Sequence, residues 1–567
     1  MLQEVYMPKN GMDMTEGTLI RWLKQVGDHV EQGEPIAEIE TDKVTMEAES
    51  PASGTLLKKL YEDGAVVPVL TTIGYLGEAG DTIPENPFVS VEPSADSRES
   101  SPTFSQQNAY QVAVIGGGPA GYVAAIRAAQ LGAGVVLFER DAVGGTCLNR
   151  GCIPTKAFLK AAECLTTIQG AASKGIVVSG TVKADLSAIV TYKNKVVKTL
   201  TSGVKRLLSS NGITVVVGEG RLASEHTIIC GQQCYTAEKI ILCGGSKAVR
   251  IPIPGVDHPN VLTSTELLDL QQLPKRLCII GGGVIGCELA SAFCAFGTQV
   301  TIVEQLDRLV ANMDRSISEA VEYQFKRQGI SLRLHETVAR IEEQAGEMIV
   351  ITEQGSVVCD KVLLSIGRRA DLSCLGDLES KLKIEHGAVL VDETMRTSIP
   401  NIYACGDING RSMLAHSASK MAETAAENCA TNQDTPCDLR YIPSILYTLP
   451  EAASIGLTED QARSRYPGGI RVGRFPMTAN SRAVIYEEPE GFVKVIADQT
   501  YGELLGVHIV GPMASEMIAE PLALMAAEAT VEDAAFHMIH GHPSYSEAFM
   551  EACKDIFGAA IHIPPKS

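Results

Sequence analysis

Short runs of alternating apolar and polar residues make up the first 79 residues. The runs "GTLIRWLKQ", "EPIAEIETD" and "GTLLKKLYE" are separated by glycines, and none of them repeats its apolar positions at helical spacing. An alternation with a period of two is typical of strands that bury one face. We therefore predict a small all-β domain over residues 1–79.

This pattern disappears over residues 80–109. The stretch, which includes "PENPFVSVEPSADSRESSP", is rich in Pro, Ser, Glu and Asp and has few large apolar residues. A segment of this composition cannot bury enough apolar surface to fold by itself, and thirty structureless residues are unusual inside a compact domain. We predict a flexible linker that spans about 30 Å root-mean-square, with a structured loop as the alternative.

From Tyr110 onward the pattern becomes an apolar strand, a glycine-rich turn, an Ala-rich helix and a second apolar strand. "YQVAVIGGGPAGYVAAIRAAQLGAGVVLFER" has this order, and "RLCIIGGGVIGCELASAFCAFGTQVTIVEQ" repeats it about 165 residues later. Strands that alternate with helices form parallel sheets covered by helices. We predict an α/β protein with two Rossmann-like domains, followed over about residues 441–567 by an α+β domain.

Length and charge narrow the class of protein. A chain of 567 residues is too long for one core, so three or four domains are expected. The net charge of −20 argues against nucleic acid and anionic lipid as partners, since both are bound by basic patches. No apolar run approaches the roughly 20 residues of a membrane helix, and no signal peptide is visible. We expect a cytoplasmic protein, or a mitochondrial matrix protein whose transit peptide has been removed.

Both glycine-rich turns have the spacing G-x-G-x-x-G. The first glycine of such a turn permits a tight bend, the second lets a pyrophosphate approach the backbone, and the third lets helix and strand pack closely. The spacing alone is weak evidence, but each turn here lies between a predicted strand and a predicted helix. We predict two dinucleotide sites, with glycine turns that bind nothing as the alternative. The glycines are Gly116, Gly118 and Gly121 in the first turn and Gly281, Gly283 and Gly286 in the second.

An acidic residue ends the second strand of each unit. Glu139 and Glu304 both lie 23 positions after the first glycine of their turn, where a carboxylate accepts hydrogen bonds from ribose hydroxyls. A carboxylate at this place repels a 2′-phosphate. No arginine occurs within three residues after Glu304, so the second site is predicted to favour NAD over NADP.

Two cysteines, Cys147 and Cys152, lie five positions apart in "GGTCLNRGCIPTK". Five residues of regular helix rise about 7.5 Å, beyond the roughly 7 Å limit for Cα atoms joined by a disulfide. We expect either an unbonded pair or an irregular loop that brings the sulfurs together before a helix near Pro154. A thiolate at that helix N-terminus, close to Lys156, would have a lowered pKa and suit thiol–disulfide exchange. The alternatives are two unrelated buried cysteines and a zinc site, but no second ligand pair lies near, and we expect no metal.

The segment "HGHPSYSE" supplies His540, His542 and Glu547. An imidazole oriented by a carboxylate is the usual arrangement of a general acid–base catalyst. On these residues alone, a histidine with a structural role and a metal site formed by His540 and His542 stay open as alternatives.

Together these motifs resemble those of the FAD-dependent pyridine nucleotide–disulfide oxidoreductases. "GGGPAGYVAA", "GGTCLNRGCIPTK", "GGGVIGCELA", "YACGDI", "YTLPEAASIGLTE" and "HGHPSYSE" occur in the family's order between about residues 110 and 567. The likeness is greatest to the members that reoxidise protein-bound dihydrolipoamide with NAD⁺ in 2-oxoacid and acetoin dehydrogenase complexes. The resemblance implies FAD and NAD as cofactors, a homodimer, and lipoyl domains and an E2 acyltransferase as partners.

The resemblance also implies a domain order. It places an FAD-binding domain over residues 110–256, an NAD-binding domain over 257–375, a central domain that contacts FAD over 376–440 and a dimer-interface domain over 441–567. Gly116, Gly118, Gly121 and Glu139 match the family's FAD motif, and Asp407 in "YACGD" matches the acid that holds the ribityl region of the flavin.

The thiol motif and the C-terminal histidine motif acquire roles from the same resemblance. Cys147 matches the interchange thiol and Cys152 the thiol that contacts the flavin. Lys156 matches the lysine beside the flavin ring, and Glu288 matches the glutamate that pairs with it. The base and its orienting carboxylate, contributed by the other subunit, are matched by His542 and Glu547.

Three cysteines depart from the usual pattern of the family. Cys243 opens "CGG" where Ala-Thr-Gly is usual, Cys287 stands where an aliphatic residue is common, and Cys405 precedes the matched Asp407 by two positions. None of the three removes a chemical group that the implied reaction needs.

The N-terminal segment resembles a lipoyl domain. Lys43 in "TDKV" matches the turn lysine that carries covalent lipoate, whereas the related biotin carriers usually flank that lysine with methionines. A β domain with an unmodified turn lysine is the alternative. Residues 1–79 contain six Lys and Arg against fourteen Asp and Glu. We hypothesise that a lipoyl group on Lys43 relays electrons from an acyltransferase to Cys147 and Cys152.

Two other functions are compatible with parts of the sequence. A glutathione- or mercuric-type reductase is disfavoured by Glu304 and by the lipoyl-like segment. A non-catalytic carrier scaffold is disfavoured because Cys147, Cys152 and His542 are all present.

Overall fold

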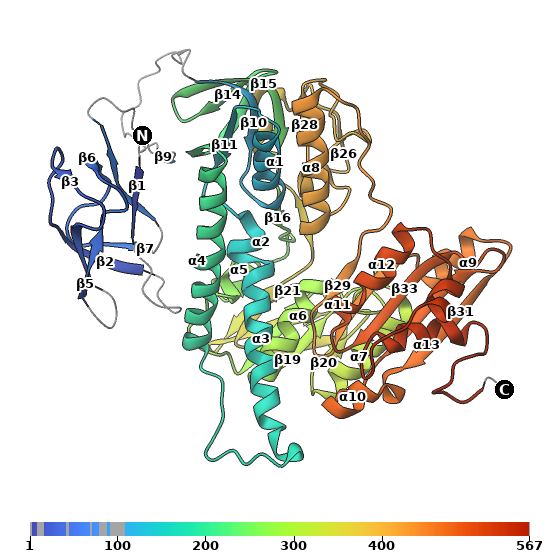
Figure 1. The fold of residues 1–567 in the computed structure, drawn as a ribbon. Helices are drawn as coiled ribbons and strands as arrows, with labels where there is room; N and C mark the ends of the chain where they lie inside the picture. Colours follow the sequence, from blue (N-terminus) through green and yellow to red (C-terminus); the bar gives the residue numbers. More distant parts are fainter. Residues whose placement is uncertain are drawn as a thin grey trace. The chain divides into compact units, whose positions relative to one another are not determined.

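The chain forms two compact units, Met1–Pro87 and Phe88–Ser567. The structure is a computed structural model, drawn in Figure 1. It describes residues 3–7, 16–40, 45–68, 71–78, 88–90 and 108–565.

The N-terminal unit consists of two four-stranded antiparallel sheets, in the orders β1–β8–β6–β3 and β5–β4–β2–β7. Inward positions of its strands, such as Leu19, Ile39 and Leu56, are fully buried, and β8 departs from strict alternation because five consecutive residues of it are buried. The all-β prediction is confirmed. The strands are β1 (Gln3–Tyr6), β2 (Glu16–Trp22), β3 (His29–Val30), β4 (Pro35–Glu40), β5 (Thr45–Glu49), β6 (Gly54–Lys59), β7 (Ala65–Pro68) and β8 (Thr72–Gly77).

The first α/β domain of the larger unit is built on an eight-stranded sheet. β10 (Ala109–Ile115) lies at its centre between β11 and β15, and its last four residues are buried because the sheet is covered on both faces. α1 and α8 pack side by side (Figure 1). The other strands are β11 (Val135–Glu139), β12 (Thr214–Val217), β13 (Gly220–Ser224), β14 (Thr227–Cys230), β15 (Gln233–Leu242) and β28 (Ile402–Ala404), and the helices are α1 (Pro119–Gln130), α2 (Gly145–Arg150), α3 (Cys152–Gln169), α4 (Leu186–Ser210) and α8 (Ala415–Thr431).

Two segments join this sheet from outside the range predicted for an FAD-binding domain. β28 pairs with β15, so part of the predicted central domain completes the first sheet. β9 (Phe88–Ser90), inside the predicted linker, pairs with the edge strand β12. An edge strand has free backbone groups, which an extended segment can satisfy even where its sequence is mostly polar. The rest of residues 80–107 lies outside the described residues.

The second α/β domain repeats the first. β18 (Arg276–Ile280) lies between β24 and β19 in a five-stranded parallel sheet, and α6 (Val284–Ala295) follows the second glycine turn with residues 286–293 all buried. The remaining elements are β17 (Val261–Leu262), β19 (Gln299–Val303), β20 (Ser331–Arg333) and β24 (Lys361–Leu364), an antiparallel sheet of β21 (Val338–Gln344), β22 (Glu347–Thr352) and β23 (Gly355–Cys359), and the helices α5 (Ser264–Leu267) and α7 (Arg315–Arg327).

Two short antiparallel strand pairs complete the centre of the larger unit. β16 (Ser246–Ala248) pairs with β25 (Arg368–Ala370), and β26 (Ile384–Glu385) pairs with β27 (Ala388–Val389). The first of these pairs brings the end of the first α/β domain next to the end of the second.

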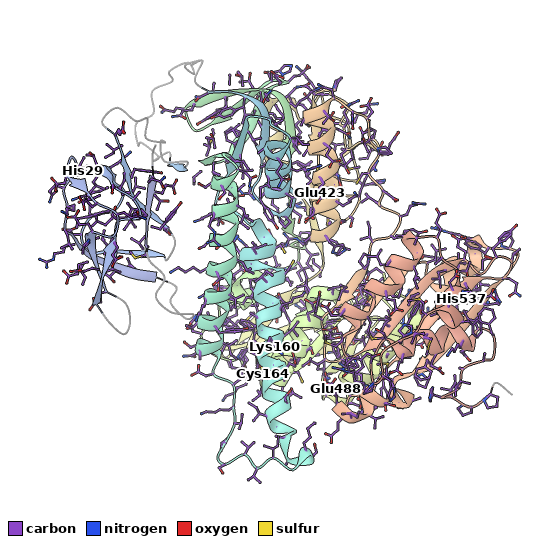
Figure 2. The ribbon with its side chains drawn as sticks, in the orientation of Figure 1. His29, Lys160, Cys164, Glu423, Glu488 and His537 are labelled. Atoms are coloured by element: carbon purple, nitrogen blue, oxygen red, sulfur yellow. The ribbon has the colours of Figure 1, made fainter. Side chains whose placement is uncertain are left out.

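The C-terminal domain is α+β, as predicted. Its antiparallel sheet has the order β29–β30–β33–β32–β31, and the strands β32 and β33 are buried along their whole length. Glu488 and His537 lie on this domain (Figure 2). No helix in the described part of the chain is long and apolar enough to cross a membrane. The elements are β29 (Ser444–Leu446), β30 (Glu451–Gly456), β31 (Ile470–Pro476), β32 (Phe492–Asp498), β33 (Leu504–Gly511), α9 (Glu459–Arg465), α10 (Ser481–Tyr486), α11 (Ala514–Met517), α12 (Ala519–Ala526) and α13 (Glu547–Asp555).

Candidate active site

The first glycine turn combines two tight backbone approaches with one open position. Gly116 has a φ of +104°, and a Cβ there would lie 2.1 Å from the carbonyl oxygen of Cys243. A Cβ on Gly121 would lie 1.7 Å from the carbonyl oxygen of Gly116. At Gly118 the nearest atom to a Cβ would be Gly145 Cα, at 3.8 Å. The first and third glycines are therefore needed for packing, and the second keeps the backbone open at the N-terminus of α1, where a pyrophosphate would bind.

The second turn has the same construction. Gly281 has a φ of +106°, and a Cβ there would lie 2.5 Å from the carbonyl oxygen of Ser365. A Cβ on Gly286 would lie 2.2 Å from the carbonyl oxygen of Gly281, whereas a Cβ on Gly283 would meet nothing within 4 Å. In both turns the first and third glycines are closely packed, and the second glycine faces open space at the N-terminus of a helix, α1 or α6.

Each acid that follows a turn also fixes the shape of that turn. Glu139 Oε2 accepts a hydrogen bond from Gly117 N at 2.6 Å, and Glu304 Oε2 accepts one from Gly282 N at 2.6 Å. Glu139 Oε1 accepts from Asp141 N at 2.9 Å, and burial raises the pKa of Glu139. An ionised carboxylate has about four acceptor positions, so both acids keep capacity for ribose hydroxyls.

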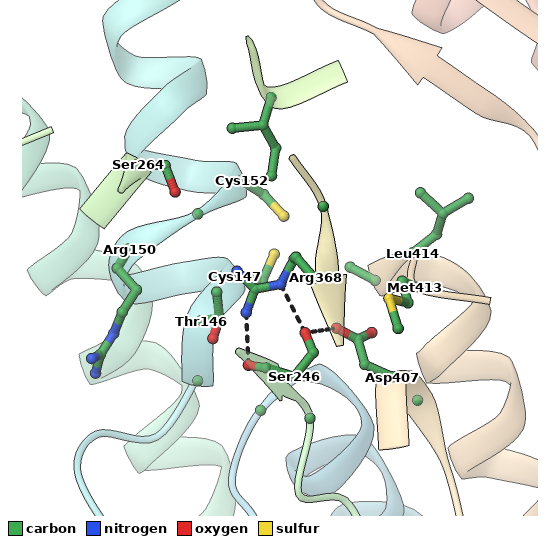
Figure 3. Close-up of a pocket in the computed structure, with 18 of the residues that line it drawn as sticks. Thr146, Cys147, Arg150, Cys152, Ser246, Ser264, Arg368, Asp407, Met413 and Leu414 are labelled. Carbon is green, nitrogen blue, oxygen red and sulfur yellow. Dashed lines mark hydrogen bonds between the residues drawn. The ribbon is translucent and has the colours of Figure 1, made fainter. Parts of the chain in front are cut away.

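Both turns open into one cavity of about 1380 Å³. A pocket for a single small ligand ordinarily measures about 300–1,000 Å³, so this cavity has room for more than one ligand. The open second glycines and the two carboxylates fit FAD at the first turn and NAD at the second. Of the site residues predicted from the sequence, Gly116, Gly118, Glu139, Cys147, Cys152, Lys156, Gly281, Gly283, Glu288, Glu304 and Asp407 line the cavity, part of which is drawn in Figure 3.

The cysteine pair lies across a break between two helices. Cys147 is in α2, which ends at Arg150, and Cys152 is the first residue of α3. Gly151 between them has non-helical angles of φ −132° and ψ −108°. The prediction of an irregular loop was too broad, because a single non-helical residue is enough to bring the two sulfur atoms together (Figure 3). Both residues are free thiols in the structure.

The two thiols have opposite acidities. A hydrogen bond from Cys147 and the positive charge of Lys156 lower the pKa of Cys152 to about 7, against the effect of burial. Donating that hydrogen bond, together with burial, raises the pKa of Cys147 well above its usual range. Cys152, at the N-terminus of α3, is therefore the thiol that ionises first, as expected for a thiolate in such a position.

Lys156 is held beside the thiols by Glu288. Lys156 Nζ donates hydrogen bonds to Glu288 Oε1 at 2.9 Å and Oε2 at 2.8 Å, and Glu288 on α6 is buried. Tyr447 N also donates to Glu288 Oε1 at 3.0 Å, and the ammonium group lies 4.4 Å from the centre of the Tyr447 ring. Tyr447 was not singled out from the sequence, although it opens the "YTLPEAASIGLTE" motif.

Asp407 belongs to a chain of hydrogen bonds that the sequence did not predict. Ser246 Oγ donates to Asp407 Oδ2 at 2.5 Å, and Arg368 donates to Ser246 Oγ and to Ser246 O, both at 2.7 Å (Figure 3). The β16–β25 pair brings Ser246 and Arg368 together, and all three residues line the cavity. No local signal marks Arg368, because its partner lies 122 residues away in the sequence.

His542 and Glu547 form a pair, but not at the thiols of their own chain. His542 Nδ1 is hydrogen-bonded to Glu547 Oε1 at 2.9 Å, and Ser544 N donates to Glu547 Oε2 at 2.7 Å. These hydrogen bonds outweigh the opposing effect of burial and hold the pKa of Glu547 below its usual range. The His542 side chain is 69% exposed and does not line the cavity. The adjacent His540 is bonded to Glu520 at 2.6 Å.

Lys43, the predicted lipoyl attachment site, lies outside the described residues. The strands β4 and β5 on either side of it in the sequence pair antiparallel, with Glu40 opposite Thr45.

Three segments of the chain match known protein families. Residues 110–422 match the pyridine nucleotide-disulphide oxidoreductase family, residues 442–553 match the dimerisation domain of that family, and residues 3–76 match the biotin/lipoyl family described as biotin-requiring enzyme.

Two curated relatives carry the same name. A dihydrolipoyl dehydrogenase of Bacillus subtilis is 38% identical over 458 residues, which is 80% of this chain and 99% of the relative. A dihydrolipoyl dehydrogenase of Chlamydia trachomatis is 39% identical over 465 residues, 81% of this chain and 99% of the relative.

Solved structures agree with the fold. The HOCl-induced flavoprotein disulfide reductase RclA from Escherichia coli has a TM-score of 0.72 and 29% identity, covering 78% of this chain and 99% of its own. LpdA from Mycobacterium tuberculosis has a TM-score of 0.72 and 26% identity, covering 78% and 99%. This chain therefore belongs to the pyridine nucleotide-disulphide oxidoreductases, in the group of the dihydrolipoyl dehydrogenases, and it carries an additional N-terminal domain of the biotin/lipoyl family.

Proposed function

We propose that the chain oxidises protein-bound dihydrolipoyl groups with NAD⁺, as the E3 component of a 2-oxoacid or acetoin dehydrogenase complex that contains an E2 acyltransferase. The observation that carries this proposal is the thiol pair Cys147 and Cys152 at the start of α3, inside the cavity that two dinucleotide turns share. The relatives named dihydrolipoyl dehydrogenase, which span four fifths of the chain, support it.

The proposed reaction is an exchange of disulfides. In the oxidised enzyme Cys147 and Cys152 are bonded. A substrate thiolate attacks Cys147 Sγ, the Cys147–Cys152 bond breaks, and a mixed disulfide forms while Cys152 leaves as a thiolate. The second substrate thiolate then displaces Cys147 and closes the lipoyl disulfide. Two electrons and two protons have moved from the substrate, and the lowered pKa of Cys152 makes it the better leaving group.

The surrounding residues prepare the pair for this exchange. Lys156, fixed by Glu288, places a positive charge next to the Cys152 thiolate and stabilises it. Gly118, Glu139 and Asp407 would hold FAD at the first turn, and Gly283 and Glu304 would hold NAD at the second. When bound, these two cofactors supply the chemistry of hydride transfer.

The proton of the substrate thiol requires a base. We assign that role to His542, oriented by Glu547, and we assign it to the partner subunit. The exposure of His542, its absence from the lining of the cavity and the matched dimerisation domain support this assignment. His542 of the partner subunit would accept the proton as the substrate thiolate forms.

The N-terminal domain suggests a carrier within the same chain. We assign covalent lipoate to Lys43, because the biotin/lipoyl match covers residues 3–76 and "TDKV" lies between β4 and β5. The lipoyl group would then receive electrons from an acyltransferase and deliver them to an enzyme disulfide.

The test is the reduction of NAD⁺ by free dihydrolipoamide with the purified holoenzyme. Turnover is expected, and Cys152→Ser should abolish it, whereas Cys164→Ser on the same helix should leave it unchanged because Cys164 is an exposed thiol that does not line the cavity. Reduction of glutathione disulfide by NADPH, without oxidation of dihydrolipoamide by NAD⁺, would refute the proposal in favour of a glutathione-type reductase.

A further inference from the structure

α4 is a basic helix in an acidic chain. Its 25 residues contain five Lys and Arg and no Asp or Glu, although the chain has a net charge of −20. Lys193 is buried and pairs with Asp269. Lys195, Lys205 and Arg206 are exposed, and no acid in the described part of the chain forms an ion pair with any of the three. Their charge is therefore available to a partner.

The same face of α4 exposes large apolar side chains. Tyr192 is 44% exposed, Leu200 is 40% exposed and Leu207 is 52% exposed. Their spacing of about two helical turns places them along one strip of the helix, next to Lys195 and Arg206. Aromatic residues and Arg are enriched at protein–protein interfaces, and a polar rim surrounds the apolar centre of such interfaces.

α4 is also next to the helices that hold the thiols. It packs against α2, which contains Cys147, and against α3, which begins with Cys152 (Figure 1). A protein held on α4 would stay close to these helices, and confinement of this kind raises the effective concentration of a group that it carries.

The N-terminal domain has the complementary charge. Glu40, Glu47 and Glu49 are exposed on β4 and β5, and Glu38 lies opposite Glu47 in the same strand pair. Lys43 comes between these two strands in the sequence. We call this strand pair, β4 and β5, the acidic hairpin, and its glutamates lie in the sequence on both sides of the lysine to which the arm would be attached.

We propose that the exposed face of α4 is a docking surface for the acidic hairpin of a lipoyl-type domain carried by a second copy of this chain. This α4 face comprises Tyr192, Lys195, Leu200, Arg206 and Leu207. The cations attract and orient the hairpin, and the apolar strip supplies the short-range contact. The inference rests on the function proposed above and names the partner surface for the same site.

The experiment compares a protein-bound donor with a small one. The donor protein is the full chain with Cys147→Ser and Cys152→Ser, lipoylated on Lys43 and chemically reduced. The enzyme is the full-length holoenzyme with Lys43→Arg, which has no arm of its own. The enzyme is tested with and without Lys195→Glu and Arg206→Glu, and kcat/KM is measured for the donor protein and for free dihydrolipoamide at low and high salt.

The charge reversal should lower kcat/KM for the donor protein about ten-fold at low salt, because steering by complementary charge changes association rates by factors of about 10 to 1,000. The loss should shrink at high salt, where exposed charges are screened. Turnover of free dihydrolipoamide should not change. Leu207→Ser should also lower kcat/KM for the donor protein, but by a factor that does not depend on salt.

A matched control separates docking from overall charge. Lys326→Glu and Lys420→Glu reverse two exposed lysines on α7 and α8 and change the net charge by the same amount. An equal loss in this control, or no loss in the α4 variant, would overturn the docking surface. If the Lys43→Arg enzyme without α4 substitutions failed to oxidise free dihydrolipoamide, the proposed function itself would be wrong. This assay contains no donor protein, so it separates a failure of the proposed function from a failure of docking.

Discussion

Lys156 Nζ lies 2.8 Å from Glu288 Oε2, and this ion pair joins α3 to α6 next to the two thiols. The two charges act on Cys152 in opposite directions. Lys156 lowers the pKa of the thiol and Glu288 raises it. The acidity of Cys152 is therefore a balance that a change at either residue should shift.

The substitution Glu288→Gln should lower the pKa of Cys152 below its value of about 7, because Lys156 then acts without a neighbouring negative charge. The measurement is a pH titration of the ultraviolet thiolate absorbance of the reduced enzyme, with Cys152→Ser as the blank. Glu163→Gln on α3, the helix of Cys152, is the matched control, since Glu163 pairs with the exposed Lys160 seen in Figure 2. A midpoint that rises in Glu288→Gln would contradict the electrostatic account.

The substitution Cys147→Ala tests the hydrogen bond within the thiol pair. This bond is the largest cause of the lowered pKa of Cys152, so removing the donor should move the midpoint from about 7 toward about 8.5, the ordinary value of a thiol. The same absorbance titration measures it. An unchanged midpoint would assign the low pKa to Lys156 and the helix N-terminus instead.

Mixed dimers test whether the base comes from the partner subunit. Cys152→Ser and His542→Gln should each be inactive alone. After dissociation and random reassociation, half of the dimers are mixed, and each mixed dimer holds one intact site made of wild-type thiols and a wild-type His542 of the partner subunit. About a quarter of the wild-type turnover should therefore return. A base acting within its own chain would give no recovery, because every chain in the mixture carries one defect.

His508 makes stability depend on pH. It is fully buried, its ring is hydrogen-bonded to Ser454 Oγ at 2.7 Å and to Leu457 O at 3.0 Å, and burial lowers its pKa to about 4. The neutral form is favoured in the folded state. The contribution of His508 to the free energy of unfolding is thus complete above its unfolded pKa of about 6.5. This contribution decreases as the pH falls toward about 4, by roughly 3 kcal/mol in total.

The unfolding midpoint should consequently fall less steeply between pH 6.5 and 4.5 in His508→Gln than in the wild type. His537→Gln, at a histidine whose side chain is 68% exposed, should keep the wild-type slope. Equal slopes in all three proteins would show that His508 does not titrate in this range.

Lys43→Arg tests the carrier assignment. The variant should lose the mass of the lipoyl group and retain wild-type turnover of free dihydrolipoamide, because the thiol site is unaltered. Flux through the reconstituted dehydrogenase complex should fall if the arm relays electrons. Unchanged flux, with the modification absent by mass spectrometry, would show that the relay is dispensable.

Most of the site features that could be predicted from the sequence involve residues that are close to one another in the chain. The glycine spacings, Glu139, Glu304 and the thiol motif all act within single strand–turn–helix units, and periodicity predicts such units. The position of the break at Gly151 was less predictable, because both flanking segments are compatible with helix.

The contacts between distant segments were not predictable in this way. Arg368 reaches Ser246 only because β16 and β25 pair, and Tyr447 reaches Glu288 only because the chain returns past α6. Such contacts depend on the packing of whole domains, which no local period encodes. The family resemblance supplied the Lys156 and Glu288 pair, but it gave no role to Tyr447, although its motif includes this residue, and it gave no indication of Arg368.

The pairing of β28 with β15 has a consequence for biosynthesis. Ile402–Ala404 joins Ile240–Leu242, and the whole second α/β domain lies between them in the sequence. The second domain is thus an insertion in the first, and the edge of β15 at Ile240–Leu242 that pairs with β28 stays uncovered until the ribosome has translated past residue 404. A nascent chain shorter than this exposes an apolar sheet edge, which is prone to wrong pairing. The first α/β domain can therefore complete its sheet only after the second α/β domain has been synthesised.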